Sequence, residues 1–371
     1  MKNLSKTERL AFMGLVTYPD ERDREISEKL SLPNSTFASA KARLLESGFI
    51  QETFVPVFPR LGMELLATVY SDFNSSVRVE ERIQNSRKTV EVYPEILLSM
   101  GESHRGFSLS TARNVTRIMR ISHERMSILA KLNLLEIELP KEVIFPYEVS
   151  WVLRYFNLAP LIFRNLVTED PKLMEDVGLP VEDLYKKDRV LRVNPRDQVN
   201  DPRDVDLSKK QLEILYYVVK YPWLSASKLS SRIPHSRHTI SRVKERLIED
   251  GYLASLRVPD LSKLDYSILT LFHAHIEPSN PLSMETATDP HILQDDTIFL
   301  VSRPRELLML GAYRDYVQYN RGRSDFNQYL KVNNFQRDLP TVRIHSLPEA
   351  IWIKKFEYHP LIKETFGLDV V

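Results

Sequence analysis

Cationic side chains gather in one short window of the sequence, residues 228–246. The window holds six Lys or Arg residues and one Glu, whereas the whole chain of 371 residues carries a net charge of +1. Apolar residues recur at helical spacing over 235–251, so a helix there would turn Arg237, His238 and Arg242 to its opposite face. Guanidinium groups form paired hydrogen bonds with phosphates and with guanine edges in the major groove. The chemistry predicted for this window is therefore contact with double-stranded DNA.

Two pairs of histidines offer a different chemistry, the ligation of a metal ion or of haem iron. His273 and His275 alternate in a β-prone run and would share one face of a strand, while His235 and His238 lie a turn apart in the cationic window. Strand histidines at a domain interface are commonly packed or hydrogen-bonded, and the other pair falls where DNA would bind. We therefore expect no metal and no cofactor.

Recognisable catalytic patterns are absent from the sequence. It contains no phosphate-binding glycine motif, no H-E-x-x-H and no G-x-S-x-G, and the acidic pair Asp295-Asp296 lies in polar loop sequence. Without cysteine, thiolate zinc sites and cysteine nucleophiles are excluded, and a reducing cytoplasm fits best. No apolar run approaches the roughly 18 residues of a membrane helix. We therefore expect a cytoplasmic protein that has neither membrane contact nor enzymatic activity.

The elements that position these residues follow from an internal repeat. Shifting the sequence by 203 positions aligns residues 4–66 with 207–269 without a gap, and 17 of the 63 aligned pairs are identical. The match returns downstream, where 95–99 align with 298–302, and again further on, where in each repeat a Trp is followed by Pro-Leu-Ile. The chain is therefore a tandem duplication.

The first third of each repeat predicts a winged helix-turn-helix, a domain that inserts its third helix into the major groove. Three short amphipathic helices are separated by tight turns, a glycine closes the third helix, and a β-prone wing follows. The helices are expected at 8–19, 24–31 and 35–48 in the first repeat, and at 209–222, 225–233 and 235–251 in the second.

The residues expected to contact DNA are those that lie on or beside the face of each third helix opposite its apolar stripe. Those of the second head are mostly cationic, namely Arg232, His235, Ser236, Arg237, His238, Ser241, Arg242, Lys244, Arg246 and Arg257. Those of the first head are mostly small, namely Asn34, Ser35, Thr36, Ser39, Lys41 and Arg43. Because residues 25–43 carry a net charge of only +1, we expect the second head to supply most of the affinity.

After each wing the sequence predicts strand, helix, two strands, helix and strand, the βαββαβ order of a ferredoxin-like domain. In the second repeat the first crossover is only weakly helical. The predicted fold class is therefore α+β, with two tandem repeats that each join a winged helix-turn-helix to a ferredoxin-like domain. We expect winged helices at 1–58 and 207–261, ferredoxin-like domains at 59–167 and 262–371, and a linker at 168–206.

A winged helix-turn-helix joined to a βαββαβ domain resembles the leucine-responsive and asparagine regulator family (Lrp/AsnC) of bacteria and archaea. The resemblance is stronger over residues 4–73 and 207–276 than over the remaining α/β sequence. It implies a transcription regulator whose partner is double-stranded DNA and whose ferredoxin-like domains form a homodimer or, here, an intramolecular pseudo-dimer. Members of that family bind amino acids between subunits, but this chain has no glycine-rich effector loop, and its effector stays unassigned.

Two alternatives to a regulator remain open at this point. The small-residue face of the first recognition helix would suit an architectural or chromatin protein that binds duplex DNA by backbone contacts alone. Relatives with a similar two-domain plan decarboxylate sirohaem, so a tetrapyrrole-binding protein of the sirohaem decarboxylase kind is the other. The repeated Trp and Pro-Leu-Ile tail is interpreted as packing against the sheet, with a protein interface as its alternative.

Overall fold

The computed structural model describes residues 4–102, 104–136, 138–172, 179–192, 198–199 and 201–370. The chain divides into two compact units, and each is assembled from three separate stretches of sequence. Unit 1 comprises Met1–Thr53, Ser150–Arg192 and Ser255–Pro348, and unit 2 comprises Phe54–Val149, Val193–Ala254 and Glu349–Val371. The domain bounds expected from the sequence stay a prediction.

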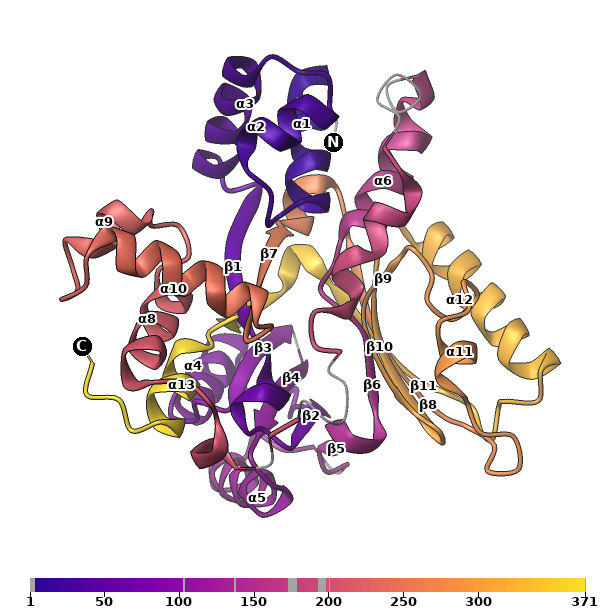
Figure 1. The fold of residues 1–371 in the computed structure, drawn as a ribbon. Helices are drawn as coiled ribbons and strands as arrows, with labels where there is room; N and C mark the ends of the chain where they lie inside the picture. Colours follow the sequence, from indigo (N-terminus) through magenta and orange to yellow (C-terminus); the bar gives the residue numbers. More distant parts are fainter. Residues whose placement is uncertain are drawn as a thin grey trace. The chain divides into compact units, whose positions relative to one another are not determined.

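Each unit contains one three-helix head (Figure 1). The helices are α1 (Lys6–Thr17), α2 (Asp23–Lys29) and α3 (Asn34–Glu46) in unit 1, and α8 (Lys209–Lys220), α9 (Ala226–Ser230) and α10 (Arg237–Glu249) in unit 2. Ser208 and Ser236 begin α8 and α10 as N-caps, accepting hydrogen bonds from backbone N–H groups of the first turn. Gly251 follows α10 with φ +72°, a conformation that favours glycine.

Each wing is a single strand, β1 (Ile50–Pro56) or β7 (Leu253–Pro259), and the two pair in a two-stranded sheet. The chain passes from one unit to the other within each of these strands. Short 3-10 helices lie at η1 (Phe58–Leu61), η2 (Tyr147–Val149), η3 (Val181–Arg189), η5 (Pro202–Asp204), η6 (Leu261–Leu264) and η7 (Leu347–Glu349).

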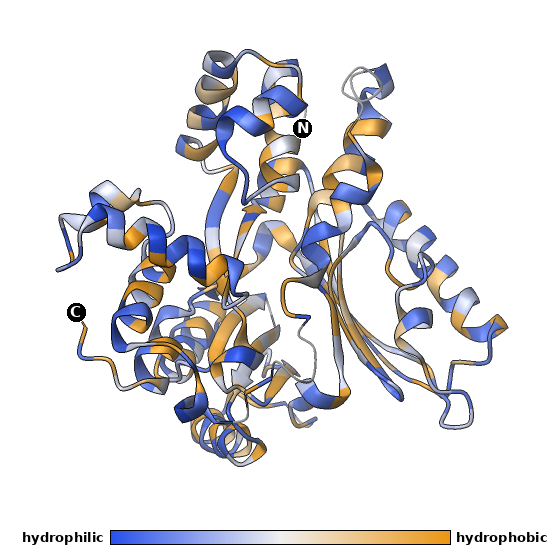
Figure 2. Ribbon diagram, viewed as in Figure 1, coloured by the Kyte–Doolittle hydropathy of each residue, from blue (hydrophilic) through white to orange (hydrophobic). Residues whose placement is uncertain are grey.

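The remainder of each unit is a ferredoxin-like domain, which confirms the predicted fold class. In unit 2 it contains β2 (Leu65–Asp72), α4 (Val79–Val90), β3 (Ile96–Glu102), β4 (Arg105–Ala112), α5 (Val115–Lys131) and β5 (Lys141–Pro146). In unit 1 it contains β8 (Ile268–His275), α11 (Met284–Ala287), β9 (Thr297–Arg303), β10 (Glu306–Tyr313), α12 (Tyr316–Val332) and β11 (Thr341–Ser346). The strands of these sheets are largely hydrophobic (Figure 2).

The tails of the two repeats are exchanged. The sheet of unit 2 runs β12-β3-β4-β2-β5, and that of unit 1 runs β11-β8-β10-β9-β6. Strand β6 (Trp151–Tyr155) comes from the first repeat but pairs with β9 of the second, while β12 (Ile351–Lys355) comes from the second repeat and pairs with β3 of the first. The helices α6 (Ala159–Glu169) and α13 (His359–Thr365) follow these strands. Each ferredoxin-like sheet is therefore completed by the other repeat.

The two ferredoxin-like domains differ in their first crossover helix. In unit 2, α4 spans 12 residues, whereas its counterpart α11 in unit 1 spans only 4. The core of unit 1 lies between the sheet and α12, where Phe272 and Ala274 of β8 pack with Phe326 and Leu330. The short α11 leaves part of this sheet face without a covering helix, and a cavity lies there.

Candidate functional site

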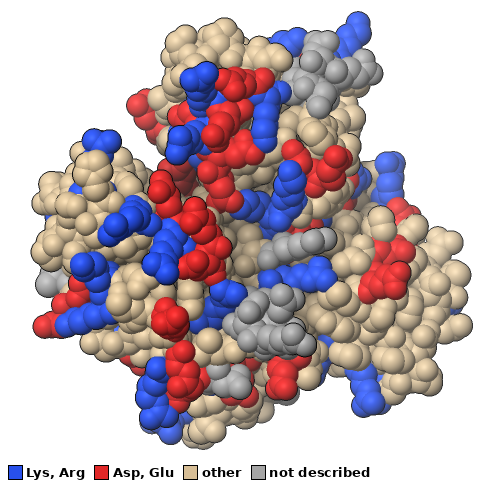
Figure 3. Space-filling view, viewed as in Figure 1, with Lys and Arg blue, Asp and Glu red and all other residues tan. Residues whose placement is uncertain are grey.

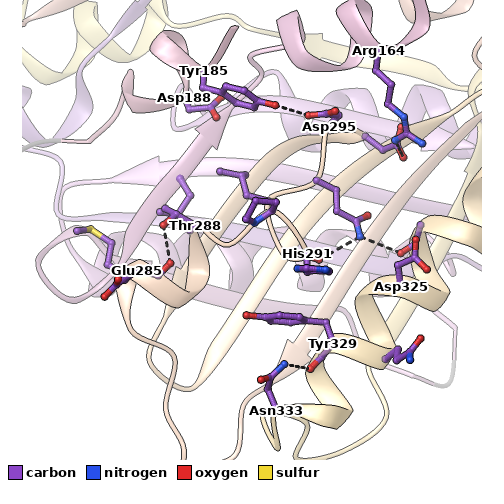
Figure 4. Close-up of a pocket in the computed structure, with 18 of the residues that line it drawn as sticks. Arg164, Tyr185, Asp188, Glu285, Thr288, His291, Asp295, Asp325, Tyr329 and Asn333 are labelled. Atoms are coloured by element: carbon purple, nitrogen blue, oxygen red, sulfur yellow. Dashed lines mark hydrogen bonds and ion pairs between the residues drawn. The ribbon is translucent and has the colours of Figure 1, made fainter. Parts of the chain in front are cut away.

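A cavity with a volume of about 1130 Å³ lies in unit 1 on the helical side of its sheet (Figure 4). The corresponding space beneath α4 and α5 in unit 2 measures about 40 Å³. The unit 1 cavity is lined by Leu153, Arg164, Tyr185, Asp188, Arg192, Met284, Glu285, Thr288, Pro290, His291, Leu293, Gln294, Asp295, Asp296, Arg321, Gly322, Asp325, Gln328, Tyr329, Val332 and Asn333. The shortened crossover helix therefore opens a space large enough for a ligand.

A buried ion pair fixes one wall of this cavity. Arg154 of β6 is fully buried, and its guanidinium donates to both carboxylate oxygens of Asp188 in η3, at 2.8 Å each. The same guanidinium donates to the carbonyl oxygens of Gln294 and Thr297, both at 2.8 Å. Burial raises the pKa of Asp188, while the charge of Arg154 opposes that shift. The exchanged strand thus anchors the lining segment.

Two further acidic groups of the cavity are engaged by neighbours. Asp296 is buried and pairs with Arg164 of α6, and burial raises the pKa of this carboxyl group. The hydroxyl of Tyr185 donates to Asp295 at 2.8 Å, and burial together with this hydrogen bond raises the pKa of Tyr185 to about 12. The negative charge of this wall is therefore largely compensated or hydrogen-bonded.

Two arginines of the lining have no carboxylate partner within the described part of the chain. Arg192 contacts only the sulfur of Met284 by hydrogen bond, and Arg321 lies exposed on α12. Guanidinium groups that are not paired with a carboxylate of the protein can form paired hydrogen bonds with carboxylates of a ligand. The cavity thus offers two cationic groups to an anionic molecule.

An aromatic pair supplies a flat surface inside the cavity. The rings of His291 and Tyr329 are stacked, with centroids 4.9 Å apart and planes inclined by 6° (Figure 4). His291 Nδ1 lies 2.9 Å from a carboxylate oxygen of Asp289, which leaves Nε2 as the ring nitrogen for a ligand. Such a surface suits a planar conjugated ligand, and the imidazole can carry a proton.

The second head exposes part of the predicted DNA face. Arg232, Ser236, Arg237, His238, Arg242 and Arg246 are exposed, and Ser241 is half-buried. Figure 3 shows Lys and Arg side chains along α10. Within this set Arg246 pairs with Asp250 at 3.2 Å, and Ser236 is the N-cap of the helix.

The remaining second-head residues are engaged inside the protein. His235 lies 3.2 Å from Glu213, and the Lys244 ammonium sits 4.2 Å from the ring centroid of Phe54. The prediction that Arg257 contacts DNA is wrong. Its guanidinium is buried against Glu52 and the backbone carbonyl oxygens of Leu15 and Tyr18, so no phosphate can reach it.

The first head presents an exposed but weakly cationic helix face. Its predicted small residues Asn34, Ser35, Thr36 and Ser39 are exposed. Of its two cations, Lys41 pairs with Asp23 at 2.8 Å and Arg43 with Glu8 at 3.3 Å. These ion pairs reduce what the first head can offer to phosphates.

The strand histidines lie away from the cavity. Because Phe272 and Ala274 face the core and side chains alternate along β8, His273 and His275 project from the opposite sheet face. His273 Nε2 lies 2.8 Å from Glu306 Oε1. Sequence analysis did not identify Glu306, because only the register of β8 with β10 brings it next to these histidines.

Comparison with known proteins identifies the fold. No protein-family model matches the chain, and no curated protein sequence matches it. The crystal structure of the siroheme decarboxylase NirDL is similar at a TM-score of 0.50 and 8% sequence identity, covering 98% of this chain and 99% of that one. The structure of NirDL in co-complex with an iron-uroporphyrin III analogue matches at a TM-score of 0.47 and 8% identity, over 93% and 92% of the two chains. The chain therefore has an Lrp/AsnC-like fold.

This comparison corrects one expectation from the sequence. We predicted a protein without enzymatic activity, yet a protein that shares its architecture over nearly the whole chain is a decarboxylase. Within the described residues, no helix is both long and apolar enough to cross a membrane.

Proposed function

We propose that this protein is an enzyme that binds a tetrapyrrole in the unit 1 cavity and decarboxylates it. The observation that carries the proposal is the cavity of about 1130 Å³, which opens where α11 replaces a full crossover helix. Typical small-molecule sites measure about 300–1,000 Å³, so this one accommodates a macrocycle. Its fold is shared with a siroheme decarboxylase from end to end.

The lining residues fit such a substrate in three ways. The stacked His291 and Tyr329 give a planar conjugated ring a surface to lie against. Arg192 and Arg321, which are open to ligand carboxylates, can pair with the acidic substituents. The apolar side chains of Leu153 and Leu293 contact the same space.

Decarboxylation requires no external oxidant or reductant. The bond between the carboxylate carbon and its neighbour breaks, CO₂ leaves, and the electron pair stays on the remaining carbon until a proton is added there. His291 is the group we assign to this proton transfer, since its imidazole lies in the cavity and is oriented by Asp289. An arginine paired with a second carboxylate of the substrate would hold the substrate in position during this step.

Titration of the full-length protein with siroheme tests the proposal. We expect a change in Soret absorption that saturates at one equivalent, and loss of CO₂ from the pigment by mass spectrometry. The double variant Arg192→Ala/Arg321→Ala should bind at least about tenfold more weakly, since each charge-assisted hydrogen bond contributes about 1.5–3 kcal/mol. Arg237→Ala, on α10, is the matched control. An unchanged Soret spectrum would refute the proposal.

A second function is supported by the exposed cationic face of α10. We infer that Arg237, His238 and Arg242 contact double-stranded DNA, because they lie on the third helix of a helix-turn-helix and are exposed. A protein that contacts DNA through this helix would fit the transcription regulator predicted from the sequence. In a fluorescence anisotropy titration against duplex DNA, Arg237→Ala/Arg242→Ala should abolish binding, with Arg24→Ala on α2 as control. Equal affinity of the variant and the wild type would remove this assignment.

A further inference from the structure

A compact set of imidazole and carboxylate groups lies on the sheet face of unit 1 opposite the cavity. His273 and His275 are separated by one residue on β8, and Glu306 begins β10, where the register pairs it with His275. The ligand atoms of these three side chains all lie within 4.8 Å of one another. His273 Nε2 is 2.8 Å from Glu306 Oε1, and His275 Nε2 is 3.8 Å from the same oxygen.

These separations are close to those of a metal's coordination sphere. Zinc binds imidazole nitrogen and carboxylate oxygen at about 2.0–2.2 Å, which places neighbouring ligand atoms roughly 3 Å apart. Small rotations of half-exposed His275 would bring its Nε2 from 3.8 Å to that separation from Glu306. The pleat already directs all three side chains to one face, so no backbone change is required.

Neighbouring side chains orient His275 and Glu306, as neighbouring groups orient the ligands of known metal sites. His275 Nδ1 lies 3.0 Å from a carboxylate oxygen of Asp338, an arrangement that fixes the imidazole and turns Nε2 toward Glu306. Arg303 Nε donates at 2.7 Å to Glu306 Oε2, the oxygen that does not face the histidines. The carboxylates of Glu306 and Asp338 beside the two imidazoles supply oxygen ligands and negative charge that suit a divalent cation.

We propose that His273, His275 and Glu306 bind one divalent transition-metal ion, with Asp338 as the group that orients His275. Two imidazoles and one carboxylate are the ligand set of catalytic zinc sites and of non-haem ferrous sites, and they leave coordination positions open. This site is independent of the proposed tetrapyrrole cavity. It also replaces the expectation from the sequence that no metal is bound.

Zinc titration of tag-free, chelator-treated full-length protein tests the proposal by calorimetry, without any tetrapyrrole. We expect one equivalent to bind, His275→Gln and Glu306→Gln to weaken binding at least about 100-fold, and Asp338→Asn to weaken it about tenfold. His123→Gln, which removes an exposed imidazole from α5, should leave the affinity unchanged. Since His275 is 48% exposed, its replacement should leave folding intact, and circular dichroism in the presence of chelator checks this.

Cobalt provides a second readout of the same site. Bound Co²⁺ should show visible d–d absorption in the wild type and in His123→Gln, and lose it in His275→Gln. Failure of the wild-type protein to bind zinc would overturn the proposal. So would zinc affinity in His275→Gln and Glu306→Gln equal to that of the wild type, because the ion would then be held elsewhere.

Discussion

The buried pair of Arg154 and Asp188 makes a sharp prediction about stability. The side chain of Arg154 is 0% exposed and that of Asp188 is 7% exposed, so neither charge can be hydrated if the other is removed. Arg154→Met keeps much of the side-chain volume but takes away the cation. It leaves a buried carboxylate whose remaining side-chain partner is Asn157, at 2.7 Å.

The expected cost follows from that geometry. Removing one member of a buried ion pair destabilises a protein by about 3–5 kcal/mol, because the other charge stays buried and uncompensated. The carbonyl oxygens of Gln294 and Thr297 also lose their donor, which places the variant in the upper part of this range. The double variant Arg154→Met/Asp188→Asn removes both charges and should regain about 2 kcal/mol.

The pH dependence of the stability of Arg154→Met provides a second, independent test of the prediction. Burial already raises the pKa of Asp188, and loss of Arg154 removes the charge that opposes this shift. The folded variant then binds the proton more tightly than the unfolded chain, so its stability falls as the pH rises above about 4. The deficit of Arg154→Met relative to wild type should therefore be larger at pH 8 than at pH 5.

Urea unfolding followed by tryptophan fluorescence at the two pH values measures both effects. The matched control is Arg24→Met, which breaks an ion pair with Glu28 whose side chains are 81% and 63% exposed. Such exposed pairs contribute little to stability, because water and salt screen their charges. A loss below about 1 kcal/mol in Arg154→Met, or a deficit that does not change with pH, would refute the reasoning about this pair.

Three further predictions concern other parts of the chain. A Cβ at Gly322 would lie 3.3 Å from a ring carbon of Tyr313, so Gly322→Leu should obstruct the cavity and weaken siroheme binding about tenfold or more, measured by Soret titration. Burial lowers the pKa of His359 to about 4, so stability should fall as the pH drops from about 6.5 toward 4, and His359→Phe should flatten this part of the unfolding profile. Ser236→Ala removes the N-cap of α10 and should cost about 1 kcal/mol in thermal unfolding, with Ser39→Ala unchanged.

Most of the fold could be predicted from the sequence repeat. Identical spacing of apolar residues in both heads predicted their helices, and alternating strands predicted the ferredoxin-like domains. Weak helical character in the second crossover was also visible, and it corresponds to the four-residue α11. These features are local, so periodicity and turn chemistry record them.

The features that build the candidate sites depend on long-range pairing. Strand β6 joins β9 across about 150 residues of chain, and no local pattern states which sheet a strand will complete. For the same reason no sequence pattern marks Arg154 of β6 as the anchor of the cavity wall. Arg257 looked available because its charge was visible in the sequence, whereas the buried carbonyl groups that hold it were not.

The head and the crossover helix of each repeat lie in different units, because the chain passes from one unit to the other within β1 and within β7. The first repeat has a 12-residue crossover helix and a head in which Lys41 and Arg43 pair with acidic neighbours. The second repeat has an exposed cationic recognition helix and a crossover helix of only four residues, next to which the cavity lies. The cavity therefore lies in unit 1 and the cationic helix in unit 2. Substitutions in one site do not remove the residues of the other, so siroheme binding and DNA binding can be tested separately in the same chain.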